Sequence, residues 1–424
     1  MTHGTFPPGF LWGASTAGHQ VEGGNVNADI WPLEWAENSV FHEPSGDACD
    51  HYHRYPEDMG LLAELGCNAY RFSLEWARIE PEPGYFSIAA LDHYRRMLET
   101  CLRLDLTPVV TLNHFTLPRW MAAKGGWSSQ DAAKRFGEFA HQAARRLGDL
   151  FSWVCTLNEP NLMAVLSATG VLAMGSKDDA QGITVGRPET VEHGISENAV
   201  SDAPDLESYR IGLVAGDIEI MAMAHRWAGE AVRDASRSAK VGWTLALIDL
   251  QAIDGAEEPC EAARKAGEGD WLTISANDDF VGVQTYSRDR IGPEGAVPPP
   301  DGAPLMQTGW EAYPEALEHT VRLAQRIAGV PVLVTENGMA TDDDEARIVY
   351  TRRALEGLAR CIGDGIDVRG YLHWTLLDNF EWLSGYTKTF GLVAVDRRTF
   401  IRTVKPSARW LGEVAKRNAL GSTL

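Results

Sequence analysis

Two glutamates stand in short polar motifs that follow apolar, strand-like runs. Glu159 lies in TLNEP (156–160) and Glu336 lies in VTENG (334–338), 177 residues further on (336 − 159 = 177). Hydrolysis of a glycosidic bond needs one carboxylic acid that donates a proton and one carboxylate that acts as nucleophile or base. Taken singly, each glutamate has a plain structural explanation, as the end of a strand before a proline or as part of a solvated turn. Taken together with their motifs, the two indicate a catalytic pair.

Three polar residues elsewhere in the chain suit this pair. Asn158 stands beside the first glutamate and can hydrogen-bond a sugar 2-hydroxyl, a contact that strengthens as charge develops at the anomeric carbon. Arg71, if it approaches Glu336, would keep that carboxylate ionised, as a nucleophile must be. A plain salt bridge in the core is the alternative role for Arg71. Tyr286 could donate a hydrogen bond to Glu336, whereas Glu159 must begin the cycle protonated.

The elements that must position these residues alternate between two kinds. Amphipathic segments, which bury one helical face, separate short β-branched or apolar runs, and this alternation predicts a parallel sheet. The predicted helices include residues 56–66, 92–105, 131–147 and 350–362. The predicted strands are Leu11–Ala14, Ala69–Ser73, Pro108–Leu112, Trp153–Leu157, Val241–Leu245, Phe280–Gln284, Val332–Thr335 and Tyr371–His373.

Eight such units without an obvious linker predict an α/β fold, a single (β/α)8 TIM barrel that spans residues 1–424 as one catalytic domain. In such barrels the active site lies at the carboxyl ends of the strands, under long βα loops. Seven of the eight predicted strands carry a polar or aromatic residue there, and only the fifth offers no candidate. These residues are Gln20, Glu22, Arg71, Asn113, His114, Asn158, Glu159, Tyr286, Glu336, Asn337 and Trp374. By itself, His114 would more often be a buried structural imidazole than a ligand-binding one.

Composition narrows the partners and the compartment. The net charge of −21 argues against nucleic acids and anionic membrane surfaces, which repel an acidic protein. Six scattered cysteines without paired spacing, no signal-like N-terminus and no long apolar run predict a cytoplasmic protein without a membrane span. The 14 tryptophans weakly favour a carbohydrate ligand, because indoles stack on sugar faces. The acidic run at 341–347 is more typical of a helix N-terminus than of a metal site, and neither metal nor cofactor is expected.

Five motifs in the same order make the chain resemble glycoside hydrolase family 1, from the first strand to about residue 396. They are FLWGASTAGHQVEG (10–23), AYRFSLEWARIEP (69–81), TLNEP (156–160), VTENG (334–338) and YLHWTLLDNFEWLSGYTKTFGLVAVD (371–396). The resemblance implies a retaining, exo-acting β-glucosidase-like enzyme that removes terminal non-reducing β-D-glycosyl residues through a covalent glycosyl-enzyme. It also implies that Glu159 is the acid/base and Glu336 the nucleophile.

The resemblance further implies how the sugar is held. Trp374 would form the stacking platform, and an anionic Glu381 would repel a 6-phosphate, which favours an unmodified sugar. The other sugar-binding residues would be Gln20, His114, Asn158, Glu381 and Trp382.

Two motifs depart from the family pattern. NHFTLP (113–118) has Phe115 and Thr116 where the family usually has Trp and Asp, and VQTY (283–286) replaces the usual Asn-Tyr-Tyr. The irregular segment at 174–207 also differs, and with the proline run at 298–300 it is predicted to lie over the barrel mouth. These departures leave the expected mechanism intact and put the preferred substrate in doubt.

Two other functions stay open at this point. A transglycosidase would use the same two glutamates and pass the glycosyl group to a sugar or alcohol, and a non-catalytic sugar-binding barrel would need neither. The expected partner is a small-molecule β-glycoside or an oligosaccharide. The preferred sugar (gluco, galacto or fuco), the aglycone and the oligomeric state, for which a homo-oligomer is one candidate, are not determined.

Overall fold

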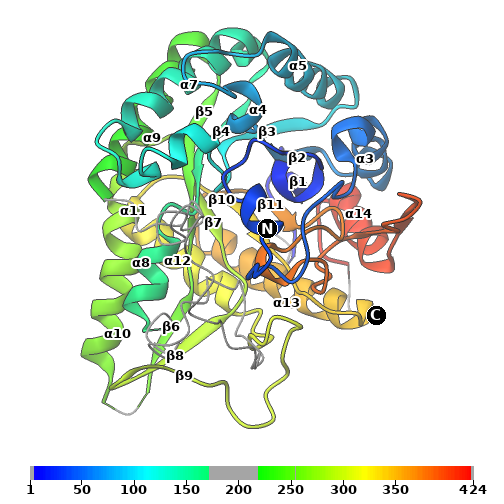
Figure 1. Cartoon of the computed structure of the whole chain (residues 1–424). Helices are drawn as coiled ribbons and strands as arrows, with labels where there is room; N and C mark the ends of the chain where they lie inside the picture. The colour runs from blue at the N-terminus through cyan, green and yellow to red at the C-terminus, as the bar shows by residue number, and fades with distance from the viewer. Residues whose placement is uncertain (1–3, 171–217, 254, 422–424) are drawn as a thin grey trace.

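Eight parallel strands close into a barrel in the computed structural model, which describes residues 4–170, 218–253 and 255–421 (Figure 1). The order around the barrel is β1-β11-β10-β7-β5-β4-β3-β2. The predicted (β/α)8 fold is confirmed, and each of the eight predicted strands is present. Their bounds are β1 Leu11–Ser15, β2 Ala69–Ser73, β3 Thr107–Asn113, β4 Trp153–Asn158, β5 Lys240–Ala246, β7 Val281–Gln284, β10 Val332–Asn337 and β11 Val368–Trp374.

Helices surround the barrel and cover its outer face (Figure 1). The longer ones are α3 His51–Leu65, α5 Ile88–Arg103, α7 Ala132–Leu147, α9 Ile218–Ala235, α12 Ala316–Ala328, α13 Asp344–Gly363 and α14 Pro406–Arg417. The shorter ones are α1 Gly18–Val21, α2 Trp31–Glu34, α4 Trp76–Ile79, α6 Arg119–Ala122, α8 Leu162–Ala168, α10 Glu257–Arg264 and α11 Asp270–Ile274, with a π-helical turn η4 at Lys265–Gly269.

The helix α7 illustrates why these segments form helices and where they end. Phe136, Phe139 and Ala143 recur at three- and four-residue spacing, and all three are buried. Two arginines occupy the last turn, where the negative end of the helix dipole favours cations. One apolar stripe therefore packs on the barrel while the opposite face stays in solvent.

The acidic run at 341–347 opens α13, as predicted. Asp343 is the N-cap, and its carboxylate accepts hydrogen bonds from the backbone nitrogens of Glu345 (3.0 Å) and Ala346 (3.2 Å). Such a cap satisfies backbone donors that the first helical turn leaves without partners. The run is therefore explained by helix initiation.

The interior of the barrel changes character along its axis. At the amino ends of the strands it holds an apolar cluster, which consists of Leu11, Ala69, Val109, Cys155, Phe280, Leu333 and Leu372. Further along the same strands the inward positions carry hydrogen-bonding side chains. Ser15 donates to the carbonyl of Thr335 (2.6 Å), and Thr244 bonds the hydroxyl of Thr335. An apolar layer at the amino ends of the strands thus lies beneath a polar layer at their carboxyl ends.

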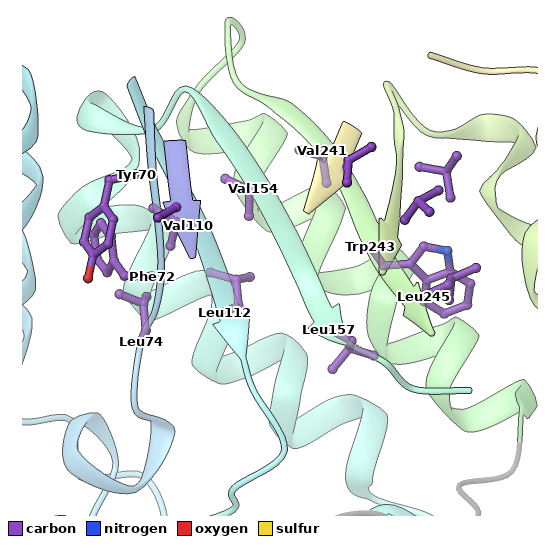
Figure 2. Close-up of a cluster of buried hydrophobic side chains, with 14 of the residues drawn as sticks. Tyr70, Phe72, Leu74, Val110, Leu112, Val154, Leu157, Val241, Trp243 and Leu245 are labelled. Atoms are coloured by element: carbon purple, nitrogen blue, oxygen red, sulfur yellow. The ribbon is translucent and has the colours of Figure 1, made fainter. Parts of the chain in front are cut away.

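The outward positions of the same strands carry the main core. Figure 2 shows Val110, Val154 and Val241 on three neighbouring strands, with Tyr70 and Phe72 on the adjacent one. All are buried in the cluster that joins the barrel to its helices. Burial of both faces explains why these strands read as almost continuous apolar runs in the sequence.

Two small sheets outside the barrel were not predicted. Strands β6 (Asp249–Ala252), β8 (Arg288–Gly292) and β9 (Gly295–Val297) form a sheet of three, which lies at the lower edge of Figure 1. Strands β12 (Val393–Val395) and β13 (Arg402–Val404) form an antiparallel pair. These strands are short and half-buried, so they lack the apolar runs by which the barrel strands were found.

The two segments predicted to lie over the barrel mouth have different outcomes. Residues 174–207 lie outside the described residues. The segment that follows 298–300 turns back to the carboxyl ends of the strands. Gln307 donates its backbone N–H to the carbonyl of Ala340 (2.9 Å), and the ring of Trp310 lies 5.6 Å from that of Tyr286. Of the helices in the described ranges, none has the length and apolar character needed to cross a bilayer.

Candidate active site

Both key strands carry an irregularity at the point where the site begins. The register shifts between Cys155 and Asn158 where β4 pairs with β5, and between Val334 and Glu336 where β10 pairs with β7. Strict alternation from Val154 and Val334, which face the helices, would also direct Asn158 and Glu336 outward. The extra residue of a β-bulge reverses that direction. Both side chains consequently point into the barrel, where they share the guanidinium of Arg71.

The carboxylate of Glu336 is held by two donors, Arg71 and Tyr286. Arg71 Nη1 lies 2.5 Å from Oε1, and the Tyr286 hydroxyl lies 2.6 Å from Oε2. Burial raises the pKa of Glu336 above its ordinary value, while the charge of Arg71 and the hydrogen bonds from Tyr286 and Arg71 oppose that rise. The two donors stabilise the ionised form that a nucleophile requires.

Glu159, immediately after β4, has a different environment. Among the described residues, none donates a hydrogen bond to its carboxyl group. Burial, followed by the negative charge of Glu336, raises the pKa of Glu159 well above its ordinary value, against the opposing charge of Arg71. Asn158, the residue before Glu159, shares the guanidinium of Arg71 with Glu336, so the two glutamates lie at the same end of the barrel. Of the pair, Glu159 is therefore the group that retains its proton.

Asn158 connects the charged centre to the neighbouring strand. Its Oδ1 accepts hydrogen bonds from Arg71 Nη2 (2.5 Å) and from Gln284 Nε2 (3.0 Å). Its Nδ2 is buried and has no hydrogen-bond partner among the described residues. The free end of the amide is therefore a donor, which suits a sugar hydroxyl.

The remaining predicted residues form an aromatic and polar wall. The ring of His114 is nearly parallel to two indoles, with its centroid 5.8 Å from that of Trp374 and 6.1 Å from that of Trp382. Trp374 Nε1 donates to Glu381 Oε1 (3.2 Å), and Gln20 Nε2 donates to the carbonyl of Phe380. Two buried polar atoms of this wall, Gln20 Oε1 and His114 Nδ1, have no hydrogen-bond partner in the part of the chain that the structure describes. Aromatic faces with a few unpaired polar atoms are typical of sugar sites.

Burial also sets the charges of the wall. It lowers the pKa of His114 well below its ordinary value, with a further contribution from Arg71, so the imidazole is neutral. It raises the pKa of Glu381 well above its ordinary value, although Trp374 donates to the carboxylate. Glu381 therefore repels a 6-phosphate only after its carboxyl group has lost its proton.

Three residues of the site adopt backbone conformations that are rare outside glycine. The φ angles are 66° for Phe115, 45° for Glu159 and 48° for Trp382. Such conformations cost of order 1–3 kcal/mol each and cluster at functional sites, where the surrounding structure imposes them. They occur here on loops that leave β3, β4 and β11.

Three of the strand-end residues have structural contacts. Glu22 pairs with Arg78 (2.8 Å), Asn113 donates to the carbonyl of Thr116 (2.7 Å), and Asn337 donates to the carbonyl of Thr285 (2.7 Å). These contacts hold the loops that surround the site.

Two further residues of the polar layer were missed or undervalued. Thr111 accepts a hydrogen bond from Arg71 Nε (2.9 Å), and its inward position on β3 could have been found from the alternation of that strand. In the sequence, Gln284 stands out only as part of VQTY (283–286), which departs from the family pattern, and no sequence signal points to its contact with Asn158. In the described part of the chain, no group of three or more His, Cys, Asp or Glu residues is arranged to hold a metal ion.

Comparison with known proteins places these features in one family. The model of Glycosyl hydrolase family 1 matches residues 2–420. A 1,4-beta-D-glucan glucohydrolase of Thermotoga neapolitana is 33% identical over 98% of this chain and 99% of its own length. Thermostable beta-glucosidase B of Thermobispora bispora is 36% identical over 98% of this chain and 92% of its own. The crystal structure of beta-glycosidase BGL167 superposes with a TM-score of 0.88 at 46% identity, covering 99% of both chains.

Proposed function

The chain belongs to glycosyl hydrolase family 1 and is a retaining β-glycosidase, and on that premise we propose that Glu336 is its nucleophile and Glu159 its acid/base. The observation that carries the assignment is the difference between the two carboxyl environments. Glu336 accepts hydrogen bonds from Arg71 and Tyr286, whereas Glu159 has a pKa raised by burial and by the charge of Glu336.

The first half of the reaction transfers the sugar to the enzyme. The Glu336 carboxylate attacks the anomeric carbon, the bond from that carbon to the aglycone oxygen breaks, and Glu159 gives its proton to the leaving oxygen. Formation of the ester removes the negative charge of Glu336. Since that charge helps to raise the pKa of Glu159, the acid becomes easier to ionise at the stage at which it has lost its proton.

The second half releases the sugar. Glu159, now ionised, takes a proton from a water molecule whose oxygen attacks the anomeric carbon, and the ester bond to Glu336 breaks. Two displacements at the same carbon restore the β configuration. The cycle returns Glu159 to the acid and Glu336 to the carboxylate, and the two glutamates supply both proton transfer and nucleophile.

The sugar-binding wall supports an exo-acting enzyme that takes a terminal β-D-glucosyl residue. Trp374 provides the stacking face. The sugar hydroxyls form hydrogen bonds with Gln20, His114, Glu381 and Trp382. Asn158 donates to the 2-hydroxyl. Glucosides are the first choice because relatives that align over nearly the whole chain carry the names beta-glucosidase and glucan glucohydrolase.

Azide can test the two roles separately, because it needs no acid or base catalysis to attack. We expect Glu159→Ala with azide to yield a β-glycosyl azide, since azide replaces water on the intact glycosyl-enzyme. We expect Glu336→Ala with azide to yield the α-glycosyl azide, since azide then takes the place of the nucleophile. NMR of the products reads the configuration directly, and reversed configurations would overturn the assignment.

A matched control separates chemistry from folding in this experiment. Glu268 on η4 is also buried, and its Oε1 accepts the backbone N–H of Ile248 (2.7 Å). Glu268→Gln should therefore retain activity on a nitrophenyl β-glucoside. Glu159→Ala should lose roughly 10²- to 10⁴-fold with poorly activated leaving groups, the usual contribution of a general acid. A panel of nitrophenyl β-glycosides ranks the sugars, and added acceptors measure any transfer to sugar or alcohol.

We also propose a cytoplasmic location and a small-molecule β-glycoside or oligosaccharide as the substrate. All six cysteines are free and buried, which suits a reducing compartment. The net charge of −21 supports the absence of nucleic-acid partners. A homo-oligomer stays a prediction that sedimentation would test.

A further inference from the structure

The amide of Asn158 is restrained at one end only. Both of its hydrogen bonds fall on Oδ1, from Arg71 on β2 and from Gln284 on β7, and its buried Nδ2 has no partner in residues 4–170, 218–253 and 255–421. Rotation of an amide about its terminal torsion is soft, so a single donor would leave the plane of the group poorly defined. Two donors on separate strands define both the acceptor end and the plane.

The two donors have different tasks. Arg71 carries a positive charge and therefore decides that the oxygen, and not the nitrogen, of the Asn158 amide faces it. Arg71 also serves Glu336 through Nη1. Gln284 is neutral, 1% exposed and fixed on a strand that pairs with β10 on one side and β5 on the other. Its hydrogen bond approaches Asn158 from a different strand and limits rotation of the amide plane.

The contact passes across the fifth strand of the barrel, β5, which carries none of the predicted site residues. Strand β5 lies between β7 and β4, so Gln284 must reach across it to contact Asn158. The inward positions of β5 are Gly242, Thr244 and Ala246, all small. The long side chain of glutamine spans the gap that these residues leave.

We propose that Gln284 is a positioning residue that aims the Asn158 Nδ2–H at the 2-hydroxyl of the bound sugar and thereby sets how strongly the enzyme depends on that hydroxyl. The inference rests on the proposed role of Asn158 in the site. The contact with the 2-hydroxyl strengthens in the transition state, so misdirecting the amide lowers kcat more than it raises KM.

The test compares a nitrophenyl β-glucoside with its 2-deoxy analogue for the wild type, Gln284→Met and Gln284→Glu. Methionine keeps the length of the side chain without a donor, and glutamate replaces the donor by an acceptor that repels Asn158 Oδ1. Both variants should lose about 10- to 100-fold in kcat/KM on the glucoside, the scale expected for a misplaced group. The 2-deoxy substrate should lose much less, so the ratio of the two values falls.

Thr285→Val provides the matched control. Thr285 is the next residue along the chain, equally buried, and its hydroxyl bonds Leu247 and Thr320 outside the polar layer. Its substitution removes buried hydrogen bonds without touching Asn158, so the ratio should stay at the wild-type value. Retained activity on the 2-deoxy substrate shows that the Gln284 variants are folded, and Gln284→Glu carries the test if Gln284→Met does not fold.

Each outcome separates this inference from the proposed function. If Asn158→Ala leaves the ratio unchanged, the role of Asn158 itself is wrong. If Asn158→Ala lowers the ratio while both Gln284 variants keep it, Gln284 has no positioning role and the inference alone is overturned. An equal loss of kcat/KM on both substrates in the Gln284 variants would also overturn the inference, because Gln284 would then have only a structural role.

Discussion

At the scale of single residues, Arg71 organises the site. One side chain contacts Thr111 through Nε, Glu336 through Nη1 and Asn158 through Nη2. A guanidinium suits this task because its donors are planar and rigid and its charge persists at any working pH. Arg71 thereby places Glu336, the proposed nucleophile, and Asn158, the proposed partner of the 2-hydroxyl, relative to each other.

The pH dependence of activity tests the hydrogen bond from Tyr286. In the proposed mechanism, activity needs ionised Glu336 and is gained as pH rises through the pKa of that group, and the Tyr286 hydroxyl lowers this pKa. Tyr286→Phe should move the acidic limb of kcat/KM to higher pH by about 1–2 units, since a hydrogen bond to a charged group contributes about 1.5–3 kcal/mol. The alkaline limb reports Glu159 and should move less.

A control tyrosine makes the pH result specific. Tyr55 lies on α3, outside the barrel, and packs against the ring of His93. Tyr55→Phe should leave both limbs in place. An acidic limb that stays at the wild-type pH in Tyr286→Phe would contradict the role assigned to this hydroxyl.

At the scale of elements, the N-cap of α13 should affect stability, whereas the bulges in β4 and β10 direct side chains into the site. The Asp343 cap supports α13 through hydrogen bonds from the backbone of Glu345 and Ala346. Asp343→Ala should reduce the free energy of unfolding by about 0.5–2 kcal/mol, the usual cost of losing an N-cap. Activity on a nitrophenyl β-glucoside at low temperature should remain unchanged.

Chemical unfolding monitored by tryptophan fluorescence measures the effect of Asp343→Ala. Asp301→Ala, at an exposed position in the loop that follows β9, serves as the control and should not alter stability. A large loss of activity in folded Asp343→Ala would show that α13 influences the site directly.

At the scale of the whole molecule, a buried ion pair joins helix α3, early in the chain, to strand β13, near its end. Arg402 on β13 donates to both oxygens of Asp58 on α3 (2.8 and 2.9 Å), and His51 lies 2.7 Å from the same carboxylate. Helix α14, which follows β13, lies beside α3 (Figure 1). Burial opposes ionisation of Asp58, but the hydrogen bonds from His51 and Arg402 hold its pKa below the ordinary value. The pair therefore helps to close the ring of helices.

Removal of the Arg402 guanidinium should leave the negative charge of Asp58 buried without its arginine partner. Arg402→Met leaves the Asp58 carboxylate buried without the two hydrogen bonds that Arg402 donates, and we expect a loss of about 3–5 kcal/mol in the free energy of unfolding at pH 7. Because the folded-state pKa of Asp58 is lowered, its contribution is present above the unfolded pKa and is lost as pH falls through the folded value. The difference between Arg402→Met and wild type should therefore shrink in acid.

Urea unfolding at pH 7 and at acidic pH measures this difference. Arg398→Met, which changes an exposed arginine on the turn before β13, should match the wild type at both pH values. A difference that is equal at both pH values would mean that Arg402 acts through packing and not through the charge of Asp58.

The sequence by itself determined the strands, the polar residues at their ends and the two glutamates. These depend on local patterns, because burial of both strand faces leaves apolar runs and the motifs TLNEP and VTENG are continuous. For Arg71 the sequence offered two roles, a partner of Glu336 and a plain salt bridge, and only the structure shows its hydrogen bond to Glu336. The prediction of one domain over residues 1–424 stays a prediction.

Only the tertiary structure decided the direction of the site side chains and the contacts between distant strands. Alternation directs Asn158 and Glu336 outward, and the bulges that turn them inward are set by pairing with β5 and β7. The contact from Gln284 to Asn158 depends on the order of strands around the barrel and on small residues between them. Register and strand order arise from partners far away in the chain, so no local pattern of residues contains them.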